Sequence, residues 1–312
     1  MVEEGKQKLQ RVAALGNFDG VHKGHALLLE ATKTLAQKLG ATSAAVVFDP
    51  HPRRFFQPDT PPFLLTLSHQ RDDLLRAKGI EHVIRLPFNE ALSRLSPDEF
   101  VEKVLRRQLG LAGVVTGAEF RFGAKRAGDA ATLASLCAEY GMKALAIEPQ
   151  TLDGTATHKI GSSGVRDAIV NGDMARAETL LGRYWTISGK VVEGQQLGRT
   201  LNFPTANIML GEYVEPKNGV YAVKCYIDGI CHGGVANYGR RPTVGASEPL
   251  LEVHLLDFDG DLYGQFLEVS FIDFIRDEKK FDGLDALKAQ IQCDSDRARC
   301  ILENDTGNLP SN

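Results

Sequence analysis

The chain has 312 residues, of which 43% are hydrophobic and 24% are charged, and its formal net charge is -4. This composition is typical of a globular protein and excludes a collagen-like fibre, a disulfide scaffold and an extensively disordered chain. The acidic balance argues against a general nucleic-acid binder, because such proteins neutralise phosphates with a basic surface. A chain of this length exceeds the usual size of one hydrophobic core, so we expect two domains.

Membrane association and disulfide bonding are not indicated either. No segment approaches the roughly 18 consecutive apolar residues of a membrane-spanning helix, and the N-terminus lacks the pattern of a secretory signal. We therefore expect a cytoplasmic protein without a membrane partner. The five cysteines show no CxxC spacing, which favours free thiols over a disulfide framework or a zinc site.

The first half of the chain alternates between short apolar runs and amphipathic stretches. The apolar runs predict strands at Val12–Leu15, Ala44–Phe48, His82–Leu86, Gly113–Thr116 and Lys143–Ile147. The amphipathic stretches predict helices at His25–Leu39, Leu67–Lys78, Pro97–Leu109 and Thr132–Tyr140. A doubly wound parallel α/β sheet with helices on both faces buries such a series economically, and its ligands bind at the carboxyl ends of the strands.

The second half begins after a short helical connection at Asp167–Leu181, where the apolar period changes to two. The alternating segments predict strands at Thr186–Val192, Val220–Ile227, Ile230–Asn237, Leu250–Leu256 and Leu267–Ile275. Asp228-Gly229 predicts a tight hairpin between two of them, and Asp259-Gly260 predicts a second hairpin. These features predict a small antiparallel barrel or sandwich that is closed by a helix at about Gly283–Gln292.

The resulting domain prediction places one domain at residues 1–182, a second at residues 183–303 and a disordered tail at residues 304–312. The most specific local motif lies in the first domain, where residues 15–25 read LGNFDGVHKGH between the first strand and the first long helix. Glycines let the backbone approach a ligand, and a helix N-terminus attracts an anion. His22 and His25 are three residues apart, so both imidazoles can face one phosphate group and, as cations, donate hydrogen bonds to it.

The spacing H-x-G-H resembles the signature of the nucleotidyltransferase superfamily. The longer strings GNFDGVHKGH and FDPHPRRFF are similar to the adenylyltransferase module of bacterial bifunctional riboflavin kinase/FAD synthetases. This resemblance implies that His22, His25 and Arg166 are catalytic. It implies nucleotide or flavin contacts from Gly16, Asn17, Phe18, Asp19, Gly20, Gly24, His51, Pro52, Glu119, Phe120, Arg121, Ser162 and Ser163.

Two segments that resemble this family depart from its pattern. Residues 117–123 read GAEFRFG, like the flavin-site loop, but Glu119 stands where Asp or Asn is usual. Residues 160–166 read IGSSGVR, like the family's I-S-S-T-x-I-R, but Gly161 replaces a serine and Ser163 replaces a threonine. The hydroxyls at Ser162 and Ser163 remain, and with Arg166 they would stabilise a triphosphate.

The second half carries the string GQQLGRTLNFPTAN at residues 194–207, which resembles the riboflavin kinase module and its P-T-A-N hallmark. Thr205 and Asn207 offer a hydroxyl and an amide oxygen, which are hard ligands suited to Mg²⁺ beside ATP phosphates. The resemblance implies that Gly198 also contacts the nucleotide. It further implies that Glu252 is the general base that accepts the proton of the ribityl hydroxyl.

The implied function is ATP-dependent phosphorylation of riboflavin to FMN in the second domain and adenylylation of FMN to FAD, with release of pyrophosphate, in the first. Riboflavin, FMN and ATP would be the small-molecule substrates. Three alternatives stay open. The first domain could adenylylate another acceptor, such as nicotinamide mononucleotide or phosphopantetheine; the chain could be a flavin carrier or a small nucleic-acid-binding barrel; or one of the two activities could be lost.

Overall fold

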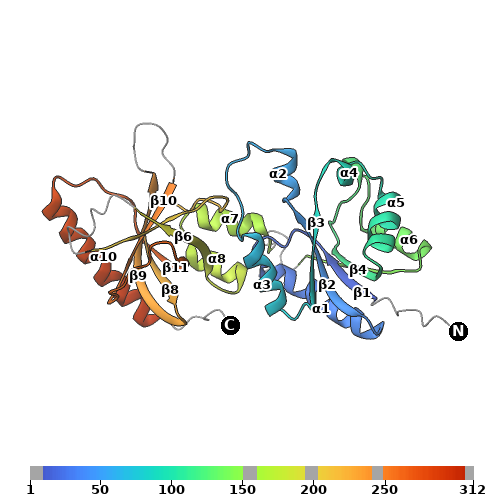
Figure 1. The fold of residues 1–312 in the computed structure, drawn as a ribbon, viewed down its shortest axis with the longest axis horizontal. Helices are drawn as coiled ribbons and strands as arrows, with labels where there is room; N and C mark the ends of the chain where they lie inside the picture. Colours follow the sequence, from blue (N-terminus) through green and yellow to red (C-terminus); the bar gives the residue numbers. More distant parts are fainter. Residues whose placement is uncertain (1–9, 150–159, 194–202, 241–248, 306–312) are drawn as a thin grey trace. The chain divides into compact units, whose positions relative to one another are not determined.

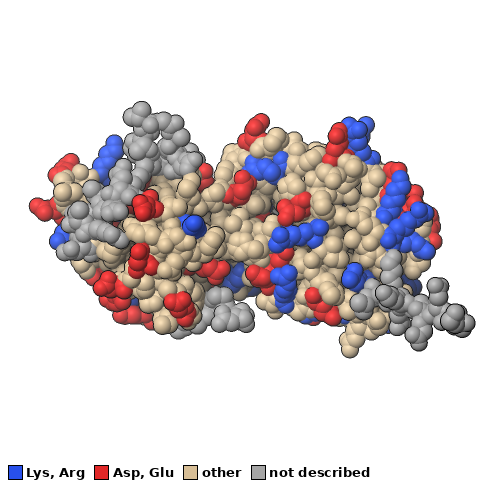
Figure 2. Space-filling view, viewed as in Figure 1, with Lys and Arg blue, Asp and Glu red and all other residues tan. Residues whose placement is uncertain are grey.

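The structure, a computed structural model, describes residues 10–149, 160–193, 203–240 and 249–305. By their internal contacts these residues form two compact units. The first takes in the described residues up to Pro61 together with Ser68–Gly161, and the second takes in Pro62–Leu67 and the described residues from Ser162 onward. On the face drawn in Figure 2, the described basic and acidic side chains are interspersed over the first unit.

The first unit is built on a parallel sheet of five strands in the order β3-β2-β1-β4-β5. The strands are β1 Arg11–Leu15, β2 Thr42–Asp49, β3 His82–Pro87, β4 Leu111–Gly117 and β5 Lys143–Ile147. Each predicted strand is present, and the predicted doubly wound sheet is confirmed (Figure 1). The helices are α1 Lys23–Lys38, α2 Pro52–Phe56, α3 Ser68–Ala77, α4 Glu90–Ser93, α5 Pro97–Glu99 and α6 Ala130–Glu139, together with a π-helix at Phe100–Gln108 and a 3₁₀ turn at Ala124–Arg126.

Both faces of the sheet are buried, because successive residues of a strand point to opposite sides. Ala14 of β1 packs in a core with Leu29 of α1 and Leu75 of α3. Its neighbour Ala13 faces the other core, together with Leu105 of the π-helix and Leu133 of α6. These two cores hold β1 in the centre of the sheet, and the loop that follows it lies at the carboxyl edge.

One predicted helix starts as expected but continues differently. Ser96 and Glu99 form a capping box, in which the Ser96 amide donates to the Glu99 carboxylate at 2.9 Å and the Glu99 amide donates to the Ser96 hydroxyl at 3.1 Å. From Phe100 onward the backbone is a π-helix rather than the predicted α-helix. The Leu109 amide therefore donates to the carbonyl of Val104, five residues back, at 2.9 Å.

The second unit contains a closed antiparallel barrel in the order β10-β7-β6-β11-β8-β9, which β9 closes by pairing with β10. This confirms the predicted barrel. Its strands are β6 Trp185–Val192, β7 Ala206–Met209, β8 Gly219–Ile227, β9 Ile230–Arg240, β10 Pro249–Leu255 and β11 Phe266–Arg276. The sequence pattern missed β7, because four residues are too few to show an alternating period. Helices α7 Ser162–Val170 and α8 Met174–Leu181 belong to this unit by contacts, whereas the domain prediction, which stays a prediction, groups them with the first half.

The two predicted Asp-Gly turns have different outcomes. Asp228 and Gly229 have φ of 49° and 79° between the paired residues Ile227 and Ile230, so the first hairpin is confirmed. Asp259-Gly260 does not form a hairpin, because β10 and β11 are not neighbours in the barrel. It lies instead in the long loop of residues 256–265 that joins these strands.

The closing helix α10 runs from Leu284 to Asn304, well beyond the predicted end at Gln292. Arg276 of β11 holds it through three hydrogen bonds of 2.6–3.1 Å to the buried carboxylate of Asp294. Asp305, just after the helix, accepts a hydrogen bond from Lys224 at 2.6 Å. Asn304 and Asp305 of the predicted tail thus have defined positions, while residues 306–312 lie outside the described residues.

Candidate active sites

The first candidate site lies where the strand order of the parallel sheet reverses. From β1 the chain proceeds to β2 and β3 on one side, and it later returns to β4 and β5 on the other. The loops after β1 and β4 therefore diverge at the carboxyl edge, which is where open α/β sheets bind ligands (Figure 1). The two motif loops of the first half, residues 16–22 and 118–122, are these two loops.

The loop after β1 has an unusual backbone. Phe18, Gly20 and Val21 have φ of 52°, 81° and 40°, in the left-handed region that is costly for a branched side chain. Strained backbone of this kind collects at functional sites, where the surrounding packing maintains it. Phe18 and Val21 are both fully buried, so the hydrophobic core holds the loop in this shape.

The two imidazoles of the H-x-G-H motif stack on each other at the start of α1. Their ring centroids are 3.6 Å apart and their planes differ by 17°. His22 is the N-cap residue and is buried, while His25, at the third helical position, is half-buried. The backbone N–H of His22 donates to Nδ1 of His25 at 3.2 Å, and the Phe18 ring lies 5.0 Å from the His25 ring. The structure brings the two histidines together, as their spacing predicts.

At two glycines of this loop a side chain would collide with neighbouring atoms. A Cβ at Gly24 would lie 2.7 Å from the carbonyl oxygen of Ile160 and 3.0 Å from Nδ1 of His22. A Cβ at Gly16 would lie 3.2 Å from the Phe18 ring. Asp19 is buried beside them. Asn17 is half-buried, and its Oδ1 accepts no hydrogen bond from the residues that the structure describes.

The loop after β4 is supported by the start of α6. Asp129 caps this helix by accepting a hydrogen bond from the Thr132 amide at 2.9 Å. This bond, with one from the Thr132 hydroxyl, holds the pKa of Asp129 below its usual range. Arg121 donates to the same carboxylate at 3.3 Å, while Glu119 is exposed and Phe120 is half-buried. The predicted flavin loop is therefore attached to a capped helix.

The loop after β2 leads into the short helix α2. His51 is its N-cap and accepts a hydrogen bond from the Arg53 amide at 3.1 Å, and Pro52 occupies the first helical position. His51 therefore has a structural role at this turn, and the binding role that the resemblance implies for His51 and Pro52 stays a prediction. The strand positions put the loop at the same sheet edge as His22 and His25, because β2 is parallel to β1.

An aromatic cluster beside this loop was missed by the sequence reasoning. Phe55, Phe56 and Phe88 meet edge to face, with ring centroids 5.2–5.6 Å apart. The side chain of Phe56 is 63% exposed, which is unusual for phenylalanine and leaves ring surface for a ligand. The adjacent Phe55-Phe56 pair is visible in the sequence, but nothing there indicates that Phe88, from the end of β3, joins it.

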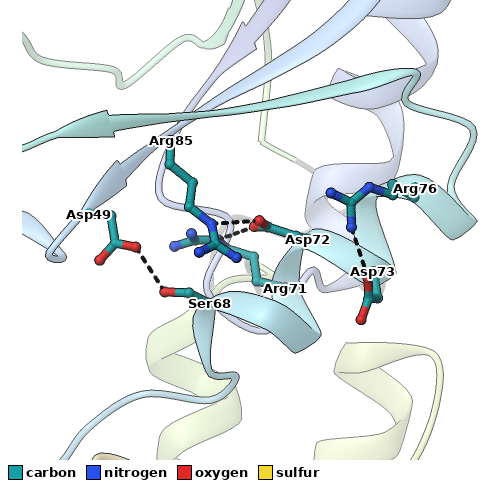
Figure 3. A network of polar contacts seen from close by, with 7 residues as sticks. All are labelled: Asp49, Ser68, Arg71, Asp72, Asp73, Arg76 and Arg85. Carbon is teal, nitrogen blue, oxygen red and sulfur yellow. Dashed lines mark hydrogen bonds and ion pairs between the residues drawn. The ribbon is translucent and has the colours of Figure 1, made fainter.

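A partly buried polar network joins α3 to β2 and β3 (Figure 3). Asp72 is almost fully buried and accepts from Arg85 at 2.7 Å, and Arg71 lies 3.4 Å from the same carboxylate. Ser68 donates to Asp49 at the end of β2 at 3.2 Å. Such charge-assisted contacts fix the start of α3 at the carboxyl edge of the sheet.

Three further predicted residues of the adenylyl site belong to the second unit. Ser162 begins α7 and is half-buried, and Ser163 is exposed. The Nε of Arg166 donates to the Phe63 carbonyl at 2.7 Å, and its guanidinium lies 5.5 Å from the centre of the Phe63 ring. These contacts anchor residues 62–67 to α7, and the predicted role of Arg166 in catalysis stays a prediction.

The second candidate site lies on the barrel, where β7 pairs with β10. Asn207 and Glu252 are directly opposite in this antiparallel pair, and Asn237 of β9 is opposite Glu252 on the other side. Opposed residues share a face of the sheet, so three polar side chains form one row. Asn207 is 3% exposed, and its Oδ1 accepts no hydrogen bond within the described part of the chain. Asn237 was missed, because register cannot be read from the sequence.

Two adjacent pockets open between β7, β10 and the loop of residues 256–265, and the larger is lined by Ala206 and Val253, the strand neighbours of Asn207 and Glu252. The larger is about 620 Å³ and the smaller is about 360 Å³, and both are bordered by Pro204, Leu255, Phe258 and Asp259. The larger is further lined by Val191, Thr205, Gly260, Asp261 and Tyr263. The smaller is further lined by Phe203, His254, Asp257, Gln292, Ser295 and Arg299. Thr205 therefore lies in the wall of a pocket that can hold a nucleotide, while Gly198 lies outside the described residues.

An ion pair between Arg299 and Asp257 lies in the wall of the smaller pocket. Arg299 of α10 donates to the Asp257 carboxylate at 2.8 Å, and this hydrogen bond lowers the pKa of Asp257. His254 lies 2.9 Å from the Pro204 carbonyl through Nδ1 and meets the Phe203 ring edge to face. The pocket thus combines aromatic surface with a paired cation and anion.

Comparisons with known proteins match both halves of the chain. A family model described as FAD synthetase matches residues 4–163, and one described as riboflavin kinase matches residues 181–302. A bifunctional riboflavin kinase/FMN adenylyltransferase of Pseudomonas fluorescens is 43% identical over 93% of this chain and 92% of that protein. The protein of the same description from Escherichia coli (strain K12) is 39% identical over 92% of this chain and 91% of its own length.

A solved structure also covers nearly the whole chain. It is a crystal structure described as a macrolide-efflux protein from Streptococcus pneumoniae, with a TM-score of 0.83 and 29% sequence identity over 93% of this chain and 94% of that one. Among the described residues of the present chain, no helix has both the length and the apolar character needed to cross a membrane.

Proposed function

The chain belongs to the family of bifunctional riboflavin kinase/FMN adenylyltransferases, and on that premise we propose where each reaction takes place and which residues perform it. Its C-terminal part phosphorylates riboflavin to FMN with ATP, and its N-terminal part adenylylates FMN to FAD. We assign the adenylyl transfer to the loop between β1 and α1, and the phosphoryl transfer to the row of polar residues on β7 and β10. A cytoplasmic location is part of the same proposal.

The adenylyl-site proposal rests on the stacked imidazoles of His22 and His25 at the N-terminus of α1. Attack of the FMN phosphate on the α-phosphate of ATP increases negative charge on the departing pyrophosphate. Hydrogen-bond donors fixed before the reaction stabilise that charge most effectively. The two histidines, the amides of the strained loop and the helix dipole are such fixed donors. The predicted roles of Arg166, Ser162 and Ser163 in adenylyl transfer stay predictions.

The flavin of FMN is assigned to the loops on either side of these histidines. The exposed face of Phe56 and the ring of Phe120 support stacking of a planar ring. Arg121 would bind a phosphate oxygen of FMN, since its guanidinium is exposed and is already oriented by Asp129. Glu119 is exposed at the same turn, so its extra length relative to aspartate is accommodated by solvent rather than by the core.

The kinase-site proposal rests on the register that puts Glu252 opposite Asn207. Glu252 would accept the proton of the ribityl hydroxyl as that oxygen attacks the γ-phosphate. The residues present fit a magnesium ion, because Asn207 Oδ1 is a buried acceptor without a hydrogen-bond donor in the described structure. Thr205 and Asn207 would hold Mg²⁺, which neutralises phosphate charge when it is bound.

The two barrel pockets are assigned to the two substrates of the kinase. The larger pocket would take ATP, because Thr205 lies in its wall and it is large enough for a nucleotide. The smaller pocket would take the flavin ring, because Phe203, Phe258 and Arg299 offer stacking surfaces. The shared wall at Pro204 would bring the γ-phosphate and the ribityl hydroxyl together beside Thr205.

Separated flavin products test both assignments. Purified protein is incubated with riboflavin, ATP and Mg²⁺, and riboflavin, FMN and FAD are quantified over time. His25→Ala is expected to accumulate FMN without FAD. Thr205→Ala is expected to form no FMN from riboflavin but to convert supplied FMN to FAD. FAD synthesis by His25→Ala at the rate of the unmodified protein would show that the adenylyl site is assigned wrongly.

A further inference from the structure

His254 of β10 makes a hydrogen bond that determines which of its ring nitrogens carries hydrogen. Its Nδ1 lies 2.9 Å from the backbone carbonyl oxygen of Pro204. A carbonyl oxygen only accepts hydrogen bonds, so Nδ1 carries the hydrogen and donates. In a neutral imidazole the other nitrogen is then an acceptor. Within the described part of the chain the ring bonds through Nδ1, which leaves Nε2 as an acceptor for a ligand.

The side of the barrel that carries His254 is the side that α10 covers. Val235 lies opposite His254 in the β9–β10 pair, and opposed residues share a face of the sheet. Val235 packs in a core with Leu256 and with Ala298 of α10. The smaller pocket opens on this side, since His254 lines it together with Arg299 of α10. The imidazole therefore lies in the wall of the pocket that we assign to the flavin.

The position of His254 relative to the proposed base suits a contact with riboflavin. His254 and Glu252 are two residues apart on one strand, so their side chains point to the same face, about 7 Å apart along the strand. The terminal ribityl hydroxyl is assigned to Glu252. Riboflavin has further hydrogen-bond donors beyond that hydroxyl, which are the secondary hydroxyls of the ribityl chain and the single N–H of the ring.

Two contacts orient the imidazole before a substrate binds. Nδ1 is anchored at Pro204, and the Phe203 ring meets the imidazole edge to face, with centroids 5.2 Å apart. An acceptor that is already oriented loses less side-chain freedom on binding than a mobile one. The bond to Pro204 also joins the residue before Thr205 to the strand that carries Glu252.

We propose that His254 is a specificity-determining residue of the kinase reaction, which accepts through Nε2 a hydrogen bond from a donor group of riboflavin. The donor is either the ring N–H or a secondary hydroxyl of the ribityl chain. The inference rests on the assignment of the smaller pocket to the flavin. A flavin without that donor would leave Nε2 unpaired, and a site that binds a substrate N–H or O–H rejects analogues that lack it.

Three substitutions separate the roles of the two ring nitrogens. In His254→Asn the amide nitrogen can replace Nδ1 and donate to Pro204, but no acceptor reaches the place of Nε2. In His254→Gln the amide oxygen can replace Nε2 as acceptor, but the donor to Pro204 is lost. His254→Phe keeps a ring and removes both groups. The control is His69→Asn, because His69 is an exposed histidine of the first unit.

The measurement is kcat/KM for phosphorylation of riboflavin, of riboflavin methylated on the ring N–H, and of analogues that each lack one secondary ribityl hydroxyl. The unmodified protein and His69→Asn should prefer riboflavin to one of these analogues by at least about 10-fold. His254→Asn and His254→Phe should lose most of that preference, while His254→Gln should keep part of it. The analogue concerned identifies the donor. The proposal is overturned if the unmodified protein shows no such preference, or if His254→Asn and His254→Phe retain it in full.

The ring state is tested separately by nitrogen-15 NMR of the full chain with labelled histidine, assigned by comparison with His254→Gln. In the neutral ring, His254 should show hydrogen on Nδ1 and an unprotonated Nε2, and hydrogen on Nε2 would overturn the inference. Glu252→Gln tests the proposed function by itself. Full FMN formation by Glu252→Gln would overturn the assigned kinase site, whatever the His254 variants show.

Discussion

Gly24 offers a direct test of how closely the adenylyl site is packed. In Gly24→Ala the new methyl group would lie 2.7 Å from the Ile160 carbonyl oxygen and 3.0 Å from His22 Nδ1. Non-bonded heavy atoms make their best contacts at about 3.5 Å, so the Ile160 carbonyl or the new methyl group must move by about 0.8 Å. The carbonyl belongs to the backbone, and His22 is stacked on His25. Since misplacement by about 1 Å can cost about 10²-fold in rate, we expect FAD formation to fall about 10- to 100-fold.

The assay measures FMN formation and FAD formation separately on the same preparation. The kinase rate should not change, because the barrel has its own core. The unmodified protein is the reference for both rates. FAD formation by Gly24→Ala equal to that of the unmodified protein would refute the argument that this packing positions His22.

Three further predictions concern stability and reactivity. Asp294→Ala removes the partner of Arg276, whose side chain is 16% exposed. We expect denaturant unfolding to show that the free energy of unfolding falls by about 3 to 5 kcal/mol. A fall below about 1 kcal/mol would contradict this prediction. Cys137 and Cys225 are fully buried, and burial raises the pKa of Cys137 to about 11. Alkylation at neutral pH should therefore modify only the three exposed cysteines, Cys231, Cys293 and Cys300, as detected by mass spectrometry. The Thr132 amide lowers the pKa of Asp129 in the folded chain. The stabilisation by Asp129 is therefore present above its unfolded pKa of about 3.9 and is lost as pH falls through the lower folded pKa. Thermal midpoints of Asp129→Ala and the unmodified chain should differ at neutral pH and converge in acid.

Most of the fold could be predicted because its signals are local. The five strands of the parallel sheet are apolar runs, and the Ser96-Pro97-Glu99 start of a helix and the Asp228-Gly229 hairpin each depend on a few adjacent residues. The errors arose where long-range contacts decide. Asp259-Gly260 has the local chemistry of a hairpin, but the barrel order separates the strands that it joins.

The end of α10 was also predicted wrongly, because it depends on contacts that are distant in the sequence. Residues 293–299 read CDSDRAR and are mostly polar, so the apolar period that predicts the helix stops near Gln292. The helix continues to Asn304, because Ala298, Ile301 and Leu302 pack in a core with the barrel strands, and Arg276, 18 residues before Asp294 in the chain, pairs with that carboxylate. Such a pair cannot be found from periodicity. It could be found only once the position of β11 relative to α10 is known.

The candidate sites divide in the same way. The H-x-G-H spacing alone predicts that two imidazoles meet, because a helix start fixes their relative positions. The hydrogen bond from the His22 amide to Nδ1 of His25 has no signal in the motif, because it depends on the path of the backbone at the helix start. Asn237 and Phe88 have no local signal at all, since each reaches its neighbours through strand order.

The two sites also differ in what holds them, and this determines which substitutions each can accept. The adenylyl site depends on backbone shape: Phe18 and Val21 are held in the left-handed region, and Gly24 has no room for a methyl group. A change of residue there alters the path of the chain. Gly161 is different, because a Cβ there has no heavy atom of the described residues within 4 Å, so packing within that part of the chain does not forbid the serine that is usual in the family. The kinase site depends on side chains that project from paired strands, and its backbone hydrogen bonds persist whichever side chains they carry. Substitutions at Asn207 or Glu252 should therefore remove chemistry while leaving the barrel folded, whereas substitutions in the β1–α1 loop should change geometry and chemistry together.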